Sequence, residues 1–303
     1  MKLDFQPLTA KDVVAVNHYF WMRPNPTCDS TFVDSFIWRT YYNIQFAVVD
    51  EKALLFLMYW DNEYSAAMPL CAPGDVEHYF YVLVDYFREE LHQKFKIALA
   101  DEPALELVAL DKTRFSVTEQ PDARDYLYSG EALRTLAGKK LHKKKNHVNA
   151  FLREYEGRYE YRSLNCDDRQ EIWGFLDKWR QKKGEGAEEH LDYEVSGIHE
   201  LLRAHDCELM KIRMGGVYID GKLEAFSVAS FNPAENMAVI HIEKANPDIN
   251  GLYQFINQQF LVHEYPTVAL VNREDDLGLE GLRQAKLSYQ PVDFARKFLI
   301  REL

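Results

Sequence analysis

The sequence is poor in the residues that build cross-links and flexible tethers. It has four cysteines and 14 glycines in 303 residues, and it contains no Gly/Ser tract or low-complexity segment. The cysteines lie far apart, without a Cys-x-x-Cys pair or a Cys/His spacing that suits zinc: Cys28, Cys71, Cys166 and Cys207. We therefore expect all four to be reduced and mostly buried, and the whole chain to be folded.

The sequence also lacks a secretion signal and a long apolar run. Residues 1–8 have neither the basic start nor the apolar stretch of a signal peptide, and no segment is apolar for long enough to span a bilayer. These absences predict a cytoplasmic protein without a transmembrane segment.

Several catalytic signatures are missing as well. The sequence has no Gly-x-Ser-x-Gly elbow, no Gly-x-x-x-x-Gly-Lys loop and no Rossmann fingerprint, which argues against a serine hydrolase, a nucleotide hydrolase or a dehydrogenase. Glu274, Asp275 and Asp276 are three consecutive acids, but no second acidic cluster completes a magnesium site. We expect no metal and no tightly bound cofactor.

Acidic residues outnumber basic ones, 48 to 36. The formal net charge is -12, which repels a phosphate backbone and disfavours general nucleic-acid binding. The segment 139–147, Lys-Lys-Leu-His-Lys-Lys-Lys-Asn-His, is the exception, because it concentrates cations in an otherwise acidic chain. This segment is a candidate contact for phosphate groups.

What the sequence does contain is a large apolar content, 47% of residues, and a repeated order of elements. Alternating and helical periods predict strand, strand, strand, helix and strand at 44–49, 53–60, 64–70, 75–91 and 95–99. The same order recurs at 211–219, 223–231, 237–244, 250–263 and 267–271. The pattern predicts an internal duplication of the α/β (α+β) class, in which each half is a mixed, mostly antiparallel sheet flanked by helices.

The remaining segments fit around this repeat. We predict two helices between the copies, one carrying the lysine run and one presenting Ile172 and Trp179, followed by a loop at 182–190. A short helix at 277–285 and an apolar run at 292–300 follow the second copy. We place the boundary between the domains near Gln120 to Asp122, which gives domains 1–125 and 126–303.

The passage from strand to loop to helix at 241–256 is a candidate anion site. A helix that begins near Asn250 and Gly251 presents unpaired backbone N–H groups, and glycine lets a ligand approach the backbone closely. The alternative is an ordinary helix capped by asparagine. In the equivalent loop of the first half, Pro73 and Asp75 occupy the places where phosphate would bind, so we expect that half to be structural.

Titratable side chains near this loop are candidates for the chemistry. Strand alternation predicts that His241 and Glu243 point to the same face, where either could accept a proton from an amine. Arg283 and Lys286, at i and i+3, share one helix face and could hold a phosphate or an oxyanion. The alternatives are a polar strand face paired with cations and a solvated helix surface.

The segment 271–291, together with Lys143 to His147 and the pair Asn250-Gly251, resembles the C-terminal domain of phosphatidylglycerol lysyltransferases. The resemblance covers most of the chain. It implies tandem GNAT-like folds, similar to the Fem-type aminoacyl and peptidyl transferases, with the acyl donor in a splayed sheet. The Gly-Leu-Arg-x-x-Lys pattern at 281–286 implies that Lys286 lies near the aminoacyl ester and stabilises the tetrahedral oxyanion.

Together these features predict an acyltransferase with its active site in the second half. The expected donor is an acyl-coenzyme A thioester or an aminoacyl-tRNA, and the expected acceptor is an amine on a small molecule, a peptide or a lipid. The expected catalytic residues are Lys286, Glu243 and His241. The expected donor-binding residues are Lys244, Ala245, Asn246, Asn250, Gly251, Tyr253, Lys143, Lys144, Asn146, Asn272 and Arg283. The alternative is a non-catalytic module that binds coenzyme A, a nucleotide or tRNA.

Overall fold

The computed structural model describes residues 3–182, 189–203 and 209–303, and its first sheet gathers both ends of the chain. The strand order is β1-β2-β3-β4-β5-β14-β6. The strands are β1 (Gln6–Pro7), β2 (Gln45–Val49), β3 (Ala53–Trp60), β4 (Glu63–Ala66), β5 (Lys96–Asp101), β6 (Phe115–Glu119) and β14 (Lys297–Glu302). The helices of this half are α1 (Val13–Val16), α2 (Phe32–Trp38), α3 (Val76–Glu89) and α4 (Glu102–Leu105).

The second sheet has the strand order β13-β7-β12-β11-β10-β9-β8. Its strands are β7 (Asp125–Ser129), β8 (Tyr159–Leu164), β9 (Arg213–Ile219), β10 (Lys222–Asn232), β11 (Met237–Ala245), β12 (Leu270–Asn272) and β13 (Asp293–Ala295). Its helices are α5 (Gly130–Thr135), α6 (His142–Glu154), α7 (Arg169–Lys182), α8 (Glu189–Arg203), α9 (Leu252–Glu264) and α10 (Glu280–Leu287). The expected loop at 182–190 falls largely outside the described residues.

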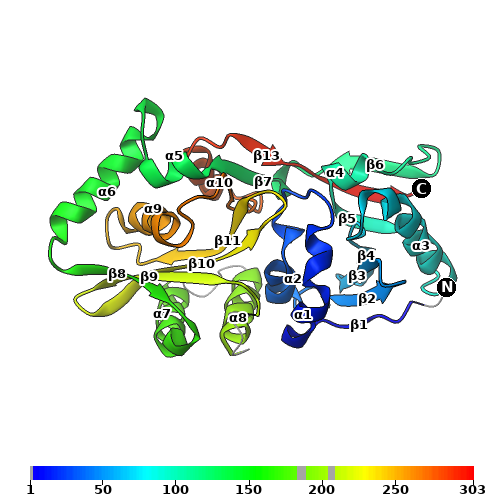
Figure 1. Ribbon diagram of the computed structural model, residues 1–303, viewed down its shortest axis with the longest axis horizontal. Helices are drawn as coiled ribbons and strands as arrows, with labels where there is room; N and C mark the ends of the chain where they lie inside the picture. Colours follow the sequence, from blue (N-terminus) through cyan, green and yellow to red (C-terminus); the bar gives the residue numbers. More distant parts are fainter. Residues whose placement is uncertain (1–2, 183–188, 204–208) are drawn as a thin grey trace.

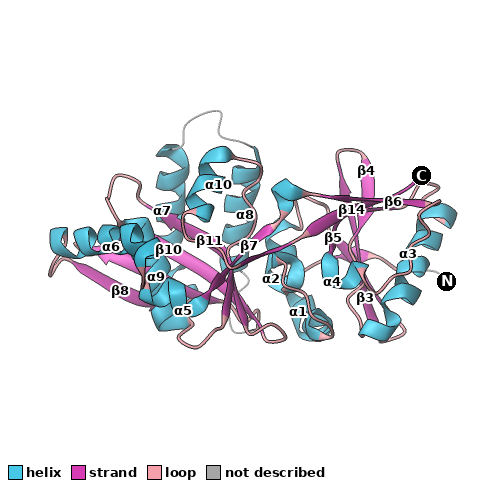
Figure 2. Ribbon diagram, turned by 90° about the horizontal axis from the view of Figure 1, so that it is seen from above, coloured by secondary structure: helices cyan, strands magenta, loops and turns pink. Residues whose placement is uncertain are grey.

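The two sheets repeat one topology, as the sequence predicted. Strands β1 to β5 of the first sheet correspond in order to β8 to β12 of the second. Each sheet has one parallel pair, β4/β5 or β11/β12, and antiparallel strands follow it. The position next to β5 is filled by β14 (Figure 2). The position next to β12 is filled by β7. The two halves therefore exchange strands. Strand β14, at the C-terminal end of the expected domain 126–303, completes the first sheet. The division into 1–125 and 126–303 stays a prediction.

Helices cover both faces of the second sheet. Figure 1 shows α6 and α9 on one side and α7 and α8 on the other. One hydrophobic cluster joins α1 and α2 of the first half to α7, α8 and β10 of the second. Gly197 allows this close packing, because a Cβ there would lie 2.5 Å from the carbonyl oxygen of Ile37 in α2. The two halves thus share a core.

Two further expectations concern the membrane and the cysteines. Among the described residues, no helix combines the length and the apolar character needed to cross a bilayer. Cys28 and Cys71 are free and buried, as expected. Cys166 is disulfide-bonded, which contradicts the expectation of four reduced cysteines, and Cys207 lies outside the described residues. The spacing of cysteines in the sequence does not reveal which of them meet in space.

Candidate active site

The parallel strands β11 and β12 pair only at their beginnings and then diverge. Met237 to Val239 pair with Leu270 to Asn272, and β12 ends there while β11 continues to Ala245. The sheet is therefore splayed between the second part of β11 and the loop that follows β12. The side chains that line this opening define the candidate site.

A β-bulge in β11 decides which way these side chains point. Val228 pairs with Ile242 and Ala229 with Ile240, so His241 is the extra residue. A bulge breaks the alternation of faces. Glu243 contacts Asn257 of α9, whereas His241 contacts Thr31 next to α2 on the opposite face. The expectation that His241 and Glu243 share a face is wrong for this reason.

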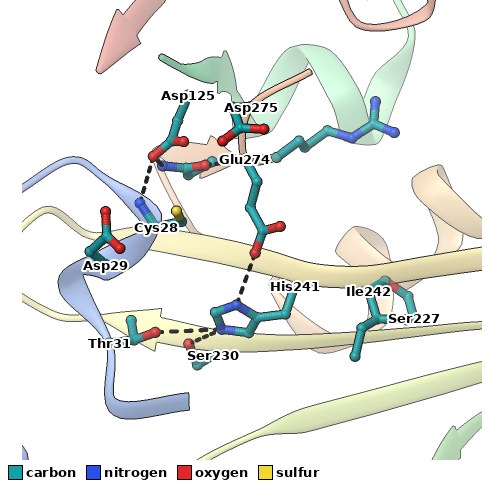
Figure 3. A network of polar contacts seen from close by, with 12 residues as sticks. Cys28, Asp29, Thr31, Asp125, Ser227, Ser230, His241, Ile242, Glu274 and Asp275 are labelled. Atoms are coloured by element: carbon teal, nitrogen blue, oxygen red, sulfur yellow. Dashed lines mark hydrogen bonds and ion pairs between the residues drawn. The ribbon is translucent and has the colours of Figure 1, made fainter. Parts of the chain in front are cut away.

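Two consecutive loop residues bridge the opening, one on each face. The guanidinium Nη2 of Arg273 donates to Glu243 Oε1 at 2.9 Å, and His241 Nδ1 lies 3.1 Å from Glu274 Oε1. Figure 3 shows His241 between Glu274 and the hydroxyls of Ser230 and Thr31. Burial lowers the pKa of His241 to about 3, so its imidazole is neutral and a weak base.

The face toward α9 keeps one hydrogen-bond donor and one acceptor unused. Asn257 Nδ2 donates to Glu243 Oε2 at 2.8 Å, so Asn257 and Arg273 hold the two oxygens of one carboxylate. Yet Arg273 Nη1 and Asn257 Oδ1 are buried and have no hydrogen-bond partner in the part of the chain that the structure describes. Because an unsatisfied buried polar group costs about 1–3 kcal/mol, a polar ligand or water that pairs with both atoms would be stabilised here.

Aromatic rings and a second cation surround this face. The Arg273 guanidinium lies 4.7 Å from the centre of the Tyr289 ring, and Lys144 Nζ lies 4.2 Å from the same ring. Burial, and next the charge of Arg273, lower the pKa of Lys144. Tyr128 forms the neighbouring wall, with its ring 5.7 Å from the guanidinium. The surroundings suit a group that carries partial negative charge.

Lys286 and Arg283 hold the loop that carries Arg273 and Glu274. Lys286 Nζ donates to the backbone carbonyls of Arg273, at 2.5 Å, and of Asp275. Arg283 Nε donates to Asp276 Oδ2 at 2.8 Å, and this guanidinium lowers the pKa of Asp276 to about 2. Burial lowers the pKa of Lys286. Lys286 thus lies behind the loop of the site, and its ammonium group is bound to backbone carbonyls of that loop.

The expected anion loop is covered by another helix. Gly251 has φ 81° and is buried, and a Cβ there would lie 2.3 Å from the carbonyl oxygen of His147 in α6. The glycine is therefore required by the backbone of α6. Asn250 is exposed, with Oδ1 3.4 Å from His147 Nδ1. A carbonyl oxygen at this helix start leaves less room for a phosphate than the sequence suggested.

The other expected donor-binding residues fall into three groups. Lys244 pairs with Glu194 of α8, and Asn246 donates to Glu224 and accepts from Lys182. Ala245 is buried, and the Tyr253 hydroxyl accepts a hydrogen bond from Trp179. These four residues have partners within the protein, and none of them is at the splayed opening.

Lys143, Lys144 and Asn146 all lie on α6, where Lys143 and Asn146 are exposed. Lys139, Lys140 and Lys145 are exposed too, and neither these three lysines nor Lys143 forms an ion pair with the part of the chain that the structure describes. We call Lys139, Lys140, Lys143 and Lys145 the lysine patch. It is a free basic surface on a helix that also carries Lys144 into the site.

Asn272 is buried at the junction of the two halves. Its amide donates to the carbonyl of Pro26 at 2.8 Å and to Asp125, and its side-chain oxygen accepts from the backbone N–H of Glu274 at 2.7 Å. Asn272 and Arg283 therefore shape the loop and do not face the opening. The sequence pattern did not predict a role for four residues that only the fold brings together: Arg273, Asn257, Tyr128 and Tyr289. Arg273 lies in the segment 271–291, directly before the three consecutive acids.

A separate cavity of about 900 Å³ lies at the other end of the second sheet. The beginning of β9, the end of α9 and Trp21 line it. None of the residues expected to bind or react is among its lining residues. The candidate active site is therefore the splayed opening and not this cavity.

With this geometry in place, comparisons identify the family. The chain matches the family model "Phosphatidylglycerol lysyltransferase, C-terminal" over residues 24–301, and it belongs to that family. A curated relative, an uncharacterized protein of Mycoplasmoides gallisepticum, is 26% identical over 179 residues. The match spans 58% of this chain and 56% of that relative, so it covers little more than half of either protein.

Solved structures show the same architecture. A protein of unknown function from Bacteroides thetaiotaomicron has a TM-score of 0.88 and 29% identity, with 100% of both chains covered. The C-terminal domain of a protein described as a lysylphosphatidylglycerol synthetase from Agrobacterium fabrum has a TM-score of 0.70 and 15% identity, covering 97% of this chain and 92% of that one.

The fold is also similar to that of FemX, with a TM-score of 0.65, 8% identity and coverage of 99% and 98%. A tandem GNAT protein from the clavulanic acid biosynthesis pathway has a TM-score of 0.52, 12% identity and the same coverage. The predicted tandem GNAT-like fold, in which each half is a mixed α/β unit, is confirmed.

Proposed function

We propose that the chain is an aminoacyltransferase that moves an aminoacyl group from a tRNA to an amine acceptor at the splayed opening. The proposal is carried by one observation on the α9 face. Arg273 Nη1 and Asn257 Oδ1 are buried beside the carboxylate of Glu243, and neither atom has a hydrogen-bond partner among the described residues. A donor, an acceptor and a base in one place are what transfer to an amine requires.

Each group has a defined part in the proposed reaction. The amine nitrogen attacks the ester carbonyl carbon, and Arg273 Nη1 donates to the oxygen that becomes negative. Glu243 accepts the proton of the amine, because it lies on this face whereas His241 lies on the other. The bond from carbon to the ribose oxygen then breaks, and the proton that Glu243 accepted passes to that oxygen. The product is an amide.

Lys286 acts in this scheme by position. Its two hydrogen bonds to the loop carbonyls hold Arg273 where the oxyanion forms. The direct contact with the carbonyl oxygen that the family resemblance implies would require Lys286 to leave those carbonyls. We expect Lys286→Ala to lower kcat about 10²-fold, since small displacements of reacting groups cost that much. An unchanged kcat with intact donor binding would remove Lys286 from the mechanism.

The choice of donor rests on α6. Its lysine patch is exposed, whereas the start of α9 is covered by the carbonyl of His147. A tRNA supplies many phosphates for the patch, while an acyl-coenzyme A would need its diphosphate at a helix start that α6 occupies. A tRNA donor also places the protein in the cytoplasm. The acceptor remains a small molecule, a peptide or a lipid.

The test uses radiolabelled aminoacyl-tRNA and candidate acceptors of the three kinds, with acetyl-coenzyme A as the competing donor. We expect label to move from tRNA to an amine acceptor, and thermal unfolding to shift with tRNA and not with coenzyme A. A shift and turnover with coenzyme A alone would establish the acyl-coenzyme A donor instead. Binding of either donor without turnover of any acceptor would favour the non-catalytic module.

A further inference from the structure

A second polar cluster lies on the opposite face of the splayed opening, toward α2. It consists of Asp34 of α2, His241 of β11 and Glu274 of the loop after β12. One ring nitrogen of His241 and one carboxylate oxygen from each acid lie within 4.8 Å of one another. Residues about 200 positions apart in sequence thus converge on one point between the two halves of the molecule.

Asp34 is the unusual member of this cluster. The residue is 6% exposed, yet no residue in the described part of the chain donates a hydrogen bond to its carboxylate or forms an ion pair with it. The nearby cation, Lys297, is engaged by Asp125 at 2.9 Å and by Asp29 at 3.3 Å. A buried carboxylate without a partner is destabilising, so either a bound proton or a cation must compensate it.

His241 Nδ1 faces the point where Asp34 and Glu274 converge. Neither neutral tautomer of His241 gives Asp34 a hydrogen bond. His241 Nε2 lies 2.7 Å from Ser230 Oγ, and Nδ1 lies 3.1 Å from Glu274 Oε1. If Nε2 carries the proton, the free lone pair of Nδ1 faces a carboxylate oxygen. If Nδ1 carries it, Glu274 gains a donor and Asp34 still has none.

We infer that Asp34, His241 and Glu274 bind a divalent metal ion. One imidazole and two carboxylates form a ligand set that suits zinc or manganese, and a histidine held through its other nitrogen by a hydroxyl is the usual support for such a ligand. The neighbouring thiol of Cys28 is already bound by Lys297 Nζ at 3.2 Å, so it is not a ligand. The ion would connect α2 of the first half to β11 and the loop of the second.

This inference reverses the expectation that no metal binds. Glu274 belongs to the acidic run 274–276, for which the sequence offers no second acidic cluster that would complete a metal site. The tertiary structure brings the missing ligands from α2 and β11. The ion would lie on the face away from Arg273, so the inference does not depend on the transfer reaction.

The experiment measures metal binding without any substrate. The full chain is incubated with zinc or manganese, passed through a desalting column and analysed by elemental mass spectrometry, and its thermal unfolding is recorded with and without metal. We expect about one ion per chain and a rise in Tm, because a ligand that binds only the folded state stabilises it.

Variants identify the ligands. Asp34→Asn and Glu274→Gln keep the size of each side chain, and we expect both to abolish stoichiometric binding and the rise in Tm. Without metal, Asp34→Asn should be at least as stable as the natural protein, since it removes a buried charge that has no partner. Asp276→Asn is the matched control, because Asp276 lies in the same loop but is bound by Arg283; it should bind metal normally.

Three results would overturn the inference. The first is no bound ion and no change in Tm for the natural protein with either metal. The second is unchanged binding by both Asp34→Asn and Glu274→Gln, which would place the ion elsewhere. The third is equal loss of binding in Asp276→Asn, which would mean that damage to the loop, and not loss of a ligand, explains the effect. Failure of aminoacyl transfer with intact metal binding would contradict only the proposed function.

Discussion

The ends of the two parallel strand pairs, β4/β5 and β11/β12, occupy equivalent places in the two halves, but their polar groups are satisfied to different degrees. In the first half Arg23 spans the gap: it donates two hydrogen bonds of 2.7 Å to Asp101, at the end of β5, and one of 3.3 Å to the carbonyl of Pro69, after β4. Asp101 also accepts from the backbone N–H of Ala104. Both charged side chains are buried and fully paired.

In the second half Arg273 and Glu243 span the corresponding gap, and the pairing is incomplete. Within the described residues, Arg273 Nη1 and Asn257 Oδ1 have no hydrogen-bond partner on one face. On the other face, the buried Asp34 receives no hydrogen bond from those residues. Buried polar groups usually have hydrogen-bond partners, because each unsatisfied group lowers the stability of the fold. We therefore expect both halves to pair theirs. The difference fits our proposals that the gap of the first half is structural and that the gap of the second half binds ligands.

The largest expected effect tests the structural assignment of the first gap. Arg23→Ala leaves the carboxylate of Asp101 buried without its cation, and we expect a loss of about 3–5 kcal/mol in the free energy of unfolding. Urea unfolding measures it. Arg88→Ala is the control, since its pair with Asp85 is exposed and contributes little. A loss no larger than that of the control would mean that the first gap is not held by this pair.

The next effect tests the second gap. Arg273→Lys keeps a cation beside Glu243 but removes the forked guanidinium, and we expect kcat to fall about 10²- to 10³-fold, as for loss of one oxyanion donor. Steady-state aminoacyl transfer measures the rate, and urea unfolding should show a folded protein. If kcat stays within twofold, the role of Arg273 is structural, like that of Arg23. The proposed functional difference between the two halves would then be wrong.

A smaller effect concerns the loop that the first half lacks. Arg283 lowers the pKa of Asp276 to about 2, below the ordinary value of about 3.9. This contribution to stability is complete above about pH 4 and is lost as the pH falls toward 2, a change of about 2–3 kcal/mol. Between pH 5 and pH 2, the free energy of unfolding should therefore fall less with decreasing pH in Asp276→Asn than in the natural protein. Urea unfolding at each pH measures it. An identical pH dependence would show that Asp276 is not the titrating group.

The smallest effect concerns the lysine patch. Replacing Lys143 and Lys145 by Ala should weaken tRNA binding modestly and reduce the slope of affinity against salt, by roughly 0.7–0.9 per lost phosphate contact. Both residues are exposed, so folding should not change. Replacing Lys52 and Lys112, exposed lysines of the first half, is the control of equal charge. Equal effects of the two pairs would indicate general attraction and not a patch.

The elements of the fold were largely predictable, and the directions of the site residues were not. The predicted strands at 53–60 and 237–244 match β3 and β11 within one residue, because apolar alternation and turn residues bound them. The bulge at His241 has no signal in the sequence, and it reversed the relation of His241 to Glu243. Helix α2, which carries Asp34, was missed because it is short and buried on several sides.

The sequence by itself determined the duplicated α/β architecture, the absence of common nucleotide-binding motifs and the concentration of lysines in one helix. These properties follow from composition and periodicity, which act locally along the chain. Only the tertiary structure decided that β14 completes the first sheet, that α6 covers Gly251, and that Arg273 and Asp34 are buried without full pairing. Whether a buried charge has a partner depends on segments that are distant in sequence, so no local pattern can reveal it.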